Sequence, residues 1–157
     1  MEQHPKDDIL AGKVNGEWVK YSSHDYYKYA HYLAYGLCEM GLKQGDRVVT
    51  MSANCPEWNF IDMALAMSGI IHVPIYPTLN TESYLHILRH SEATAVFVST
   101  KVLLGRLRPA LDQMETKPQV YTLMAVDDEH RNLPLRLHQN RPHPPNIAPT
   151  YPQQPLN

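Results

Sequence analysis

The stretch Gly45–Thr78 constrains the fold more than any other part of this chain, because it alternates between two kinds of periodic structure. Residues 47–52 form a short run rich in β-branched side chains, which predicts a strand. Pro56 then stands where a helix tolerates it best, in the first turn, and the helix is expected to run to about Gly69. Residues 70–76 are a continuous apolar run, which predicts a strand buried on both faces. A strand, a helix and a strand in this order indicate a βαβ unit.

The remainder of the first 130 residues continues this alternation. The pair Asn15-Gly16 between two short alternating runs is the strongest local signal for a type I′ hairpin, here over residues 13–21. A first helix is expected from Ser22 or Ser23 to Gly41, and a second begins at a cap at Asn54 or Cys55. A third is expected from Asn80 or Thr81 to Leu88, and a fourth over 101–113, where Pro109 should interrupt or kink the helix. Strands are expected over 95–98 and 119–126. The predicted fold class is α/β: a partial βαβ, mostly parallel sheet flanked by helices and preceded by a β-hairpin.

Composition divides the chain into two unequal parts. Residues 1–130 hold all 16 acidic residues against 11 Lys and Arg, whereas residues 131–157 hold three Arg, no acid and seven of the 13 prolines. Proline lacks a backbone donor, so we expect a disordered tail with polyproline II character. The predicted organisation is a flexible N-terminus over 1–8, an α/β subdomain over 9–128 and a Pro-rich disordered tail over 129–157.

Charge, hydropathy and cysteine content exclude several classes of protein. The net charge of -2 offers no basic face for nucleic acid or for an anionic membrane. The N-terminus lacks the basic start and apolar run of a signal peptide, and no apolar segment reaches the roughly 18 residues of a membrane span. Cys38 and Cys55 lack the CxxC spacing of a zinc or redox site and are expected to be reduced, buried thiols. A cytoplasmic location is therefore expected.

Three histidines are candidates for chemistry. His86 and His90 lie four residues apart on a predicted helix, a spacing that can place two imidazoles on one face for a metal ion. The glutamate of an HExxH motif and a third ligand are missing, so solvated or capping histidines are expected. His72 lies within the apolar run and is expected to be a satisfied core histidine rather than a general base.

Carboxylates and tyrosines are the other candidates, and packing or local bonds explain most of them. Glu57 and Asp62 lie five residues apart on one helix, so they do not converge as a catalytic pair would. Asp46 and Arg47 are expected to form a turn bond or an ion pair, with a substrate contact as the alternative. Six of the ten tyrosines lie between residues 21 and 35, where packing of one helical face is favoured over an aromatic binding platform.

Phosphate-binding motifs are missing from the sequence. It contains no GxxxxGK[ST], no GxGxxG and no GxSxG pattern, and its seven glycines are too far apart to form a phosphate-cradling loop. No residue is therefore assigned a catalytic, cofactor-binding or metal-binding role.

An ordered set of short motifs nevertheless resembles one enzyme family. A hairpin and a tyrosine-bearing helix precede GL-x-x-GDRV, N-x-PEW and VPIYPT, and over residues 9–126 this order resembles the long-chain members of the AMP-forming acyl-CoA synthetases. The resemblance implies activation of a fatty acid by ATP to an acyl-adenylate and then transfer to CoA, with Mg²⁺ bound, in the full-length enzyme. The family's phosphate loop, its catalytic lysine and its mobile C-terminal domain have no matching position here, and Cys55 stands where an arginine is common.

The resemblance leads to one main expectation and two alternatives. The chain is expected to be a truncated N-terminal portion of a long-chain fatty acid CoA ligase, inactive alone and cytoplasmic, with the parent enzyme at most peripheral to a membrane. Fatty acid, ATP and CoA would be partners of that parent only, and the fragment itself would bind no cofactor. The first alternative is a regulatory module that pairs with a full-length synthetase, or with itself, through an uncovered sheet surface. The second is an adaptor that presents the Pro-rich tail, unless that tail is the product of a frameshift.

Overall fold

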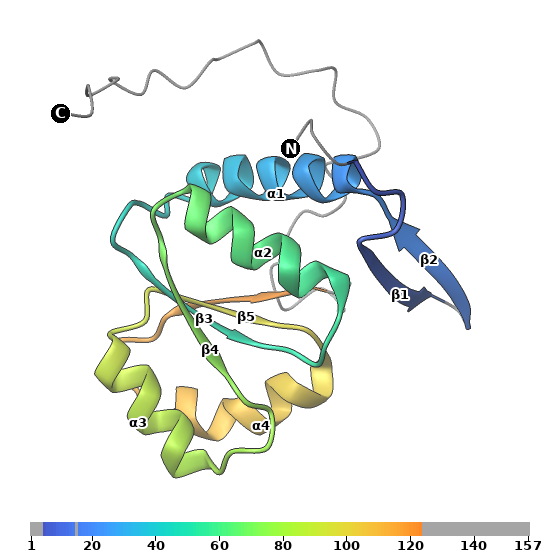
Figure 1. Ribbon diagram of the computed structural model, residues 1–157. Helices are drawn as coiled ribbons and strands as arrows, with labels where there is room; N and C mark the ends of the chain where they lie inside the picture. The colour runs from blue at the N-terminus through green and yellow to red at the C-terminus, as the bar shows by residue number, and fades with distance from the viewer. Residues whose placement is uncertain (1–4, 15, 124–157) are drawn as a thin grey trace, which may run out of the picture.

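A four-stranded parallel sheet forms the centre of the protein, with helices on both of its faces and a two-stranded antiparallel hairpin beside it (Figure 1). The computed structural model describes residues 5–14 and 16–123. The elements are β1 (Leu10–Val14), β2 (Glu17–Tyr21), α1 (Ser23–Glu39), β3 (Arg47–Met51), α2 (Pro56–Met67), β4 (Ile71–Ile75), α3 (Thr81–Ser91), β5 (Ala95–Val98), α4 (Lys101–Leu111) and β6 (Gln119–Thr122). The order of the sheet is β4-β3-β5-β6. The α/β fold class with a leading hairpin is confirmed.

The core has two layers, one on each face of the sheet. Helices α1 and α2 lie on one side, and α3 and α4 lie on the other (Figure 1). Alternate residues of the central strands enter opposite layers, so Val48 and Phe97 pack toward α1 and α2, while Val49 and Val96 pack toward α3 and α4. Each of these four side chains is fully buried. The strands β3 and β5 are therefore the hydrophobic centre of the fold.

The apolar run over residues 70–76 behaves differently from the expectation. It forms β4, but β4 is an edge strand whose only hydrogen-bonded neighbour in the described sheet is β3. Ile71 is 52% exposed, Pro74 is exposed, and Ile75 is the one buried residue of the strand. The prediction of a strand buried on both faces is wrong here and fits β5 instead, since all of its residues are buried. Pro74, which cannot donate to a ladder, suits an edge position.

The helix caps follow the local sequence closely. Ser22 Oγ accepts a hydrogen bond from the backbone N–H of Asp25, and the Asp25 carboxylate accepts one from the N–H of Ser22, which completes a capping box at α1. Gly41, with φ at 85°, follows the end of that helix. Asn80 Oδ1 caps α3 by accepting from the Ser83 N–H at 2.8 Å. Helix α3 continues three residues past the expected end, to Ser91.

Pro109 does not interrupt α4, so the expected interruption is wrong. The helix continues through Pro109 to Leu111. Proline removes one intrahelical bond, the one its missing N–H would make to the Gly105 carbonyl, and this loss falls in the last turn. Ala110 and Leu111 are buried in the core layer between the sheet and helices α3 and α4, and their packing holds the final turn in place.

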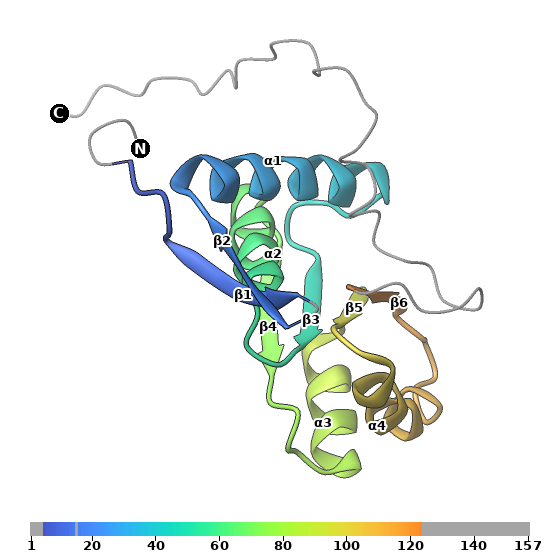
Figure 2. The same cartoon turned by 90° about the vertical axis from the view of Figure 1, so that its right-hand side faces the viewer.

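The hairpin is fastened to α2 by close packing. Gly12 of β1 approaches the Pro56 ring so closely that a Cβ at position 12 would lie 2.9 Å from two ring carbons. Tyr21 of β2 meets the Phe60 ring edge-on, with 5.4 Å between centroids. Figure 2 shows β1 and β2 running across the side of α2. The hairpin is confirmed, while Asn15 of its turn lies outside the described residues.

Some expectations concern residues that the structure does not describe. Strand β6 covers residues 119–122 of the expected 119–126, and the Pro-rich tail lies outside the described ranges, as do residues 1–4. Among the described helices, none has both the length and the apolar character needed to cross a membrane.

Candidate functional site

A chain of three polar side chains links α2, β4 and β3. His72 Nδ1 lies 2.7 Å from Asp62 Oδ1, and His72 Nε2 lies 2.7 Å from Thr50 Oγ1. The parallel register sets Val48 opposite His72, and Val48 faces α1 and α2. The imidazole therefore lies on the face of the sheet that α2 covers. The Trp58 ring packs against the imidazole, with 5.5 Å between centroids. Of the predicted candidates, His72 and Asp62 are thus brought together.

The order of carboxylate, imidazole and hydroxyl is that of a hydrolase triad, but the burial of the hydroxyl argues against that chemistry. In a triad the hydroxyl must reach a substrate carbonyl. Thr50 is 3% exposed and lies within the sheet, so a substrate cannot reach its hydroxyl. The arrangement instead gives each buried polar atom a partner, as the interior of a protein requires. The expectation that His72 is a satisfied core histidine is confirmed.

The partnership of Asp62 with His72 was not predicted from the sequence. The two residues are ten positions apart and belong to different elements, so no helical or strand periodicity connects them. Asp62 is 48% exposed and His72 is 12% exposed at the side chain. Only the packing of α2 over the β3–β4 pair brings them to hydrogen-bonding distance.

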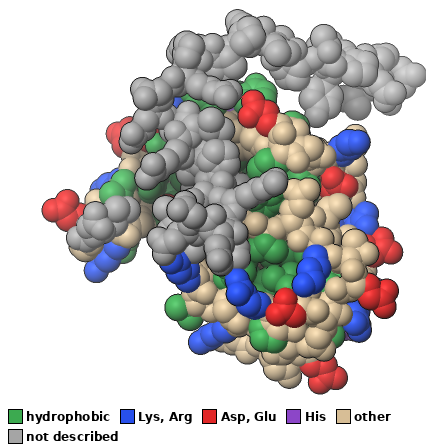
Figure 3. All heavy atoms as spheres, turned by 180° about the vertical axis from the view of Figure 1, so that it is seen from behind, with side chains coloured by type: hydrophobic (Ala, Val, Ile, Leu, Met, Phe, Trp, Pro, Cys, Tyr) green, Lys and Arg blue, Asp and Glu red, His purple; other side chains and the backbone are tan. Residues whose placement is uncertain are grey.

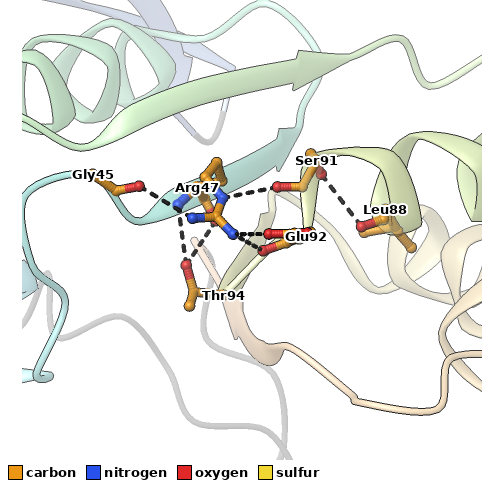
Figure 4. A network of polar contacts seen from close by, with 6 residues as sticks. All are labelled: Gly45, Arg47, Leu88, Ser91, Glu92 and Thr94. Atoms are coloured by element: carbon orange, nitrogen blue, oxygen red, sulfur yellow. Dashed lines mark hydrogen bonds and ion pairs between the residues drawn. The ribbon is translucent and has the colours of Figure 1, made fainter.

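Arg47 connects the start of β3 to the end of α3 (Figure 4). Its guanidinium donates to the Ser91 carbonyl at 2.9 Å and to the Glu92 carboxylate at 2.7 Å. A cation at this place is favoured because the C-terminal carbonyls of a helix carry partial negative charge. Asp46 accepts a turn bond from the Lys43 N–H at 2.8 Å. The predicted turn bond is confirmed at Asp46, whereas Arg47 forms its ion pair with Glu92, a partner that the sequence analysis did not name.

The tyrosine cluster belongs to the core. Tyr21, Tyr26 and Tyr29 surround Phe60, with ring centroids 5.1–5.9 Å from it. Burial raises the pKa of Tyr21 and of Tyr26 above the usual phenol value, and nearby carboxylates add to this effect. Packing of one helical face is therefore confirmed as the reason for the cluster. The aromatic residues on the outer side of α1, such as Tyr27 and Tyr35, remain half exposed.

The cysteines and the histidine pair are the remaining candidates. Cys38 is exposed on α1, so the expectation of a buried thiol is wrong for it, because position 38 falls on the outward face of the helix. Cys55 is half-buried, and desolvation raises the pKa of its thiol. His86 and His90 stack on α3 with 5.8 Å between ring centroids.

A surface hollow of about 760 Å³ lies at the amino ends of β5 and β6. It is lined mainly by the end of α3 and residues 114–119, with Arg89, Glu92 and Lys117 among the charged side chains. Seen from behind, acidic and basic side chains alternate around apolar ones on the part of the surface that is coloured (Figure 3). A hollow with both signs of charge carries no strong preference for a charged ligand.

Comparison with known proteins decides the family. The profile of the family described as AMP-binding enzyme matches residues 1–156 of the chain. The chain belongs to this family. It is 33% identical over 102 residues to the long-chain-fatty-acid–CoA ligase FadD15 of Mycobacterium bovis, an alignment that covers 62% of this chain and 17% of the relative. It is 31% identical over 121 residues to fatty acyl-CoA synthetase B of Dictyostelium discoideum, covering 77% of this chain and 18% of that protein. This member of the AMP-binding enzyme family thus spans less than a fifth of the length of these relatives.

Several solved structures share the fold. The luciferase-like enzyme of the mealworm Zophobas morio superimposes with a TM-score of 0.68 at 17% identity, over 73% of this chain and 27% of that enzyme. A benzoate CoA ligase of Burkholderia xenovorans superimposes with a TM-score of 0.62 at 18% identity, over 74% of this chain and 23% of the ligase. At these identities the likeness concerns the fold alone.

The motifs that this chain shares with the family occupy structural positions. In GL-x-x-GDRV, Gly45 has φ at 86° and donates its N–H to the Gly69 carbonyl, which joins two loops at the amino end of the sheet. In N-x-PEW, Pro56 opens α2. Family membership implies ATP as a substrate of the full-length enzymes. The described part of the chain holds no group of three His, Cys, Asp or Glu side chains suited to a metal ion.

Proposed function

We propose that this chain is the N-terminal α/β portion of a long-chain fatty acid CoA ligase and that it has no ligase activity by itself. The observation that carries the proposal is the match to relatives named as a long-chain-fatty-acid–CoA ligase and as a fatty acyl-CoA synthetase, which covers only 17–18% of their length. The positions of the motifs support it, since Gly45 and Pro56 shape turns and helix starts and do not present reactive groups. The complete enzyme would use ATP, Mg²⁺, CoA and a fatty acid, in the cytoplasm or at the periphery of a membrane.

Two assays test this function. The purified chain is incubated with ATP, Mg²⁺, palmitate and CoA, and release of AMP and pyrophosphate is measured. The chain is then mixed with FadD15 of Mycobacterium tuberculosis from which the matching N-terminal segment has been removed, a relative that is 32% identical over 102 residues. We expect no product from the chain alone and restored activity in the mixture.

A folding-defective variant provides the control for complementation. Phe97 is fully buried in β5, so Phe97→Asp places an unpaired charge in the core and prevents folding. This variant should restore nothing, because complementation requires the folded scaffold. Fatty acid dependent release of AMP by the chain alone would refute the claim of inactivity. Failure of the wild-type mixture, with both parts shown to be folded, would refute the scaffold role.

An exposed sheet edge favours a second candidate function, that of a module which associates with a complete synthetase. Strand β4 leaves one row of backbone groups unpaired within the described sheet, and Ile71 on it is 52% exposed. Tyr76, directly after the strand, is 77% exposed. Such an edge can add a strand from another chain.

The module hypothesis predicts co-purification with a full-length ligase of the family. Ile71→Lys should abolish the association, because a charge on the edge opposes strand addition. Val102→Lys is the matched control, since Val102 is an equally apolar residue, 68% exposed, that lies on α4. Equal binding by both variants would exclude the β4 edge, and a homodimer in sedimentation experiments would show that a second copy of this chain is the partner.

A further inference from the structure

Two imidazoles lie next to each other on the outer side of α3. His86 and His90 lie one helical turn apart, their rings are inclined by only 9°, and their centroids are 5.8 Å apart. Both residues are exposed, so an ion and its water ligands can reach them. Sequence spacing alone suggested solvated histidines; the structure adds that both rings are exposed and lie close together on the same side of the helix.

The helix that carries the pair is held rigidly. On its inner face Tyr84 is 1% exposed and Leu88 is fully buried, and both pack in the core layer between the sheet and helices α3 and α4. Asn80 caps its first turn, and Arg47 bonds to the carbonyls at its end. The two exposed rings must turn out of their stacked arrangement to face a common ion, but the helix that carries them is already ordered, so little backbone entropy is lost when they do.

We propose that His86 and His90 form a two-imidazole site for a divalent late transition metal ion, with Cu²⁺ bound most tightly. Imidazole nitrogen is a preferred ligand of Cu²⁺, Ni²⁺ and Zn²⁺, and affinities rise to Cu²⁺ along the Irving–Williams order. Water molecules complete the coordination, because the described residues offer no third protein ligand beside the pair. The local charge is compatible: Glu82 lies one turn earlier on α3, while the Arg89 guanidinium is directed to the Gln113 carbonyl at 3.0 Å.

The site is one of binding and not of hydrolysis. In an HExxH motif the residue after the first histidine is a glutamate that acts as general base. Here that residue is Ile87, which is partly buried against the core layer between the sheet and helices α3 and α4. A bound ion would stabilise the folded helix, because the two rings are brought together only in the native state.

Titration of the full chain with Cu²⁺ tests the site. Calorimetry gives the affinity, and electron paramagnetic resonance counts the coordinating nitrogens. We expect two imidazole nitrogens in the tightest site and a rise of Tm on addition of Cu²⁺. His86→Ala and His90→Ala should each weaken this site by about tenfold or more, because the second ring acts at a high effective concentration.

Matched variants separate this pair from the other histidines of the chain, which number nine in all. His31→Ala is the control: His31 packs on the Tyr27 ring, its Nδ1 lies 2.8 Å from the Tyr27 carbonyl oxygen, and its loss should leave the tight site unchanged. Circular dichroism confirms that each variant is folded. Unchanged Cu²⁺ affinity in the His86→Ala/His90→Ala double variant would overturn the proposal and assign the ion to other histidines.

Discussion

Replacement of His72 by leucine should expose the cost of a buried hydroxyl that has lost its partner. In the native protein the Thr50 hydroxyl is 2.7 Å from His72 Nε2, and Thr50 is 3% exposed. His72→Leu removes the imidazole and leaves that hydroxyl where water cannot reach it. A buried polar group without a partner costs about 1–3 kcal/mol. The other lost contact, to Asp62, contributes less, because Asp62 is 48% exposed and water can solvate its carboxylate.

A second substitution should restore part of the stability lost in His72→Leu. Thr50→Val in the His72→Leu background removes the unsatisfied hydroxyl and keeps nearly the same side-chain shape. Replacement of both partners of a buried hydrogen bond by apolar groups is close to neutral. The double variant is therefore expected to be more stable than the His72→Leu variant, by most of the roughly 1–3 kcal/mol that the lone hydroxyl costs.

Urea unfolding followed by circular dichroism measures these differences. For small proteins the slope is about 1–3 kcal/mol per molar urea, so a loss of about 2 kcal/mol shifts the midpoint by about 1 M. Asp62→Asn is the control, because the amide keeps an oxygen acceptor for His72, and we expect a change of about 0.5 kcal/mol or less. A double variant no more stable than His72→Leu would refute the reasoning that the orphaned hydroxyl is the source of the cost.

Three further predictions follow from the packing of the hairpin, the cap of α1 and the two thiols. Gly12→Ala brings a Cβ within 2.9 Å of the proline ring that opens α2, so a loss of about 1–3 kcal/mol is expected in urea unfolding, and an unchanged midpoint would contradict it. Hydrogen bonds from Ser22 hold the pKa of Asp25 below its ordinary value of 3.8. The stability they contribute is complete above that value and is lost as the pH falls through the lower pKa of the folded state. Ser22→Ala should therefore raise the pKa of Asp25 in a carboxyl NMR titration and cost about 1 kcal/mol at neutral pH, and an unshifted titration would count against the cap. Iodoacetamide at pH 8 should modify Cys38 before Cys55, because Cys38 is exposed whereas burial raises the pKa of the Cys55 thiol; mass spectrometry that finds Cys55 modified first would disprove this order.

Local signals predicted most elements of this fold, whereas the burial of the run over 70–76 was predicted wrongly because it depends on topology. Caps at Ser22 and Asn80 and the β-branched run of β3 are local features, and each was located from neighbouring residues. The run over 70–76 is as apolar as a central strand, but its burial depends on whether another strand pairs beyond it. The order β4-β3-β5-β6 decides that question, and no local pattern specifies that order.

The polar chain of His72 shows the same limit at the level of a site. The sequence identified a buried histidine that needs partners, because the residue lies inside an apolar run. Its partners come from the neighbouring strand and from the helix that crosses it, so they depend on the β3–β4 register and on the rotation of α2. Sequence reasoning can thus predict that a partner must exist, and only the three-dimensional packing names it.

The two ends of the sheet differ in a way that bears on the proposed scaffold role. At the amino end, Arg47 at the start of β3 bonds to Thr94 before β5 and to the Ser91 carbonyl at the end of α3. These polar groups therefore have partners. At the carboxyl end, Ser99 Oγ is buried and has no hydrogen-bond partner among the described residues, and Tyr76 is 77% exposed. Open α/β sheets bind ligands at the carboxyl ends of their strands. If the chain is the N-terminal portion of a ligase, as proposed, further polypeptide is expected to meet the sheet at its carboxyl end, and the complementation assay tests that expectation.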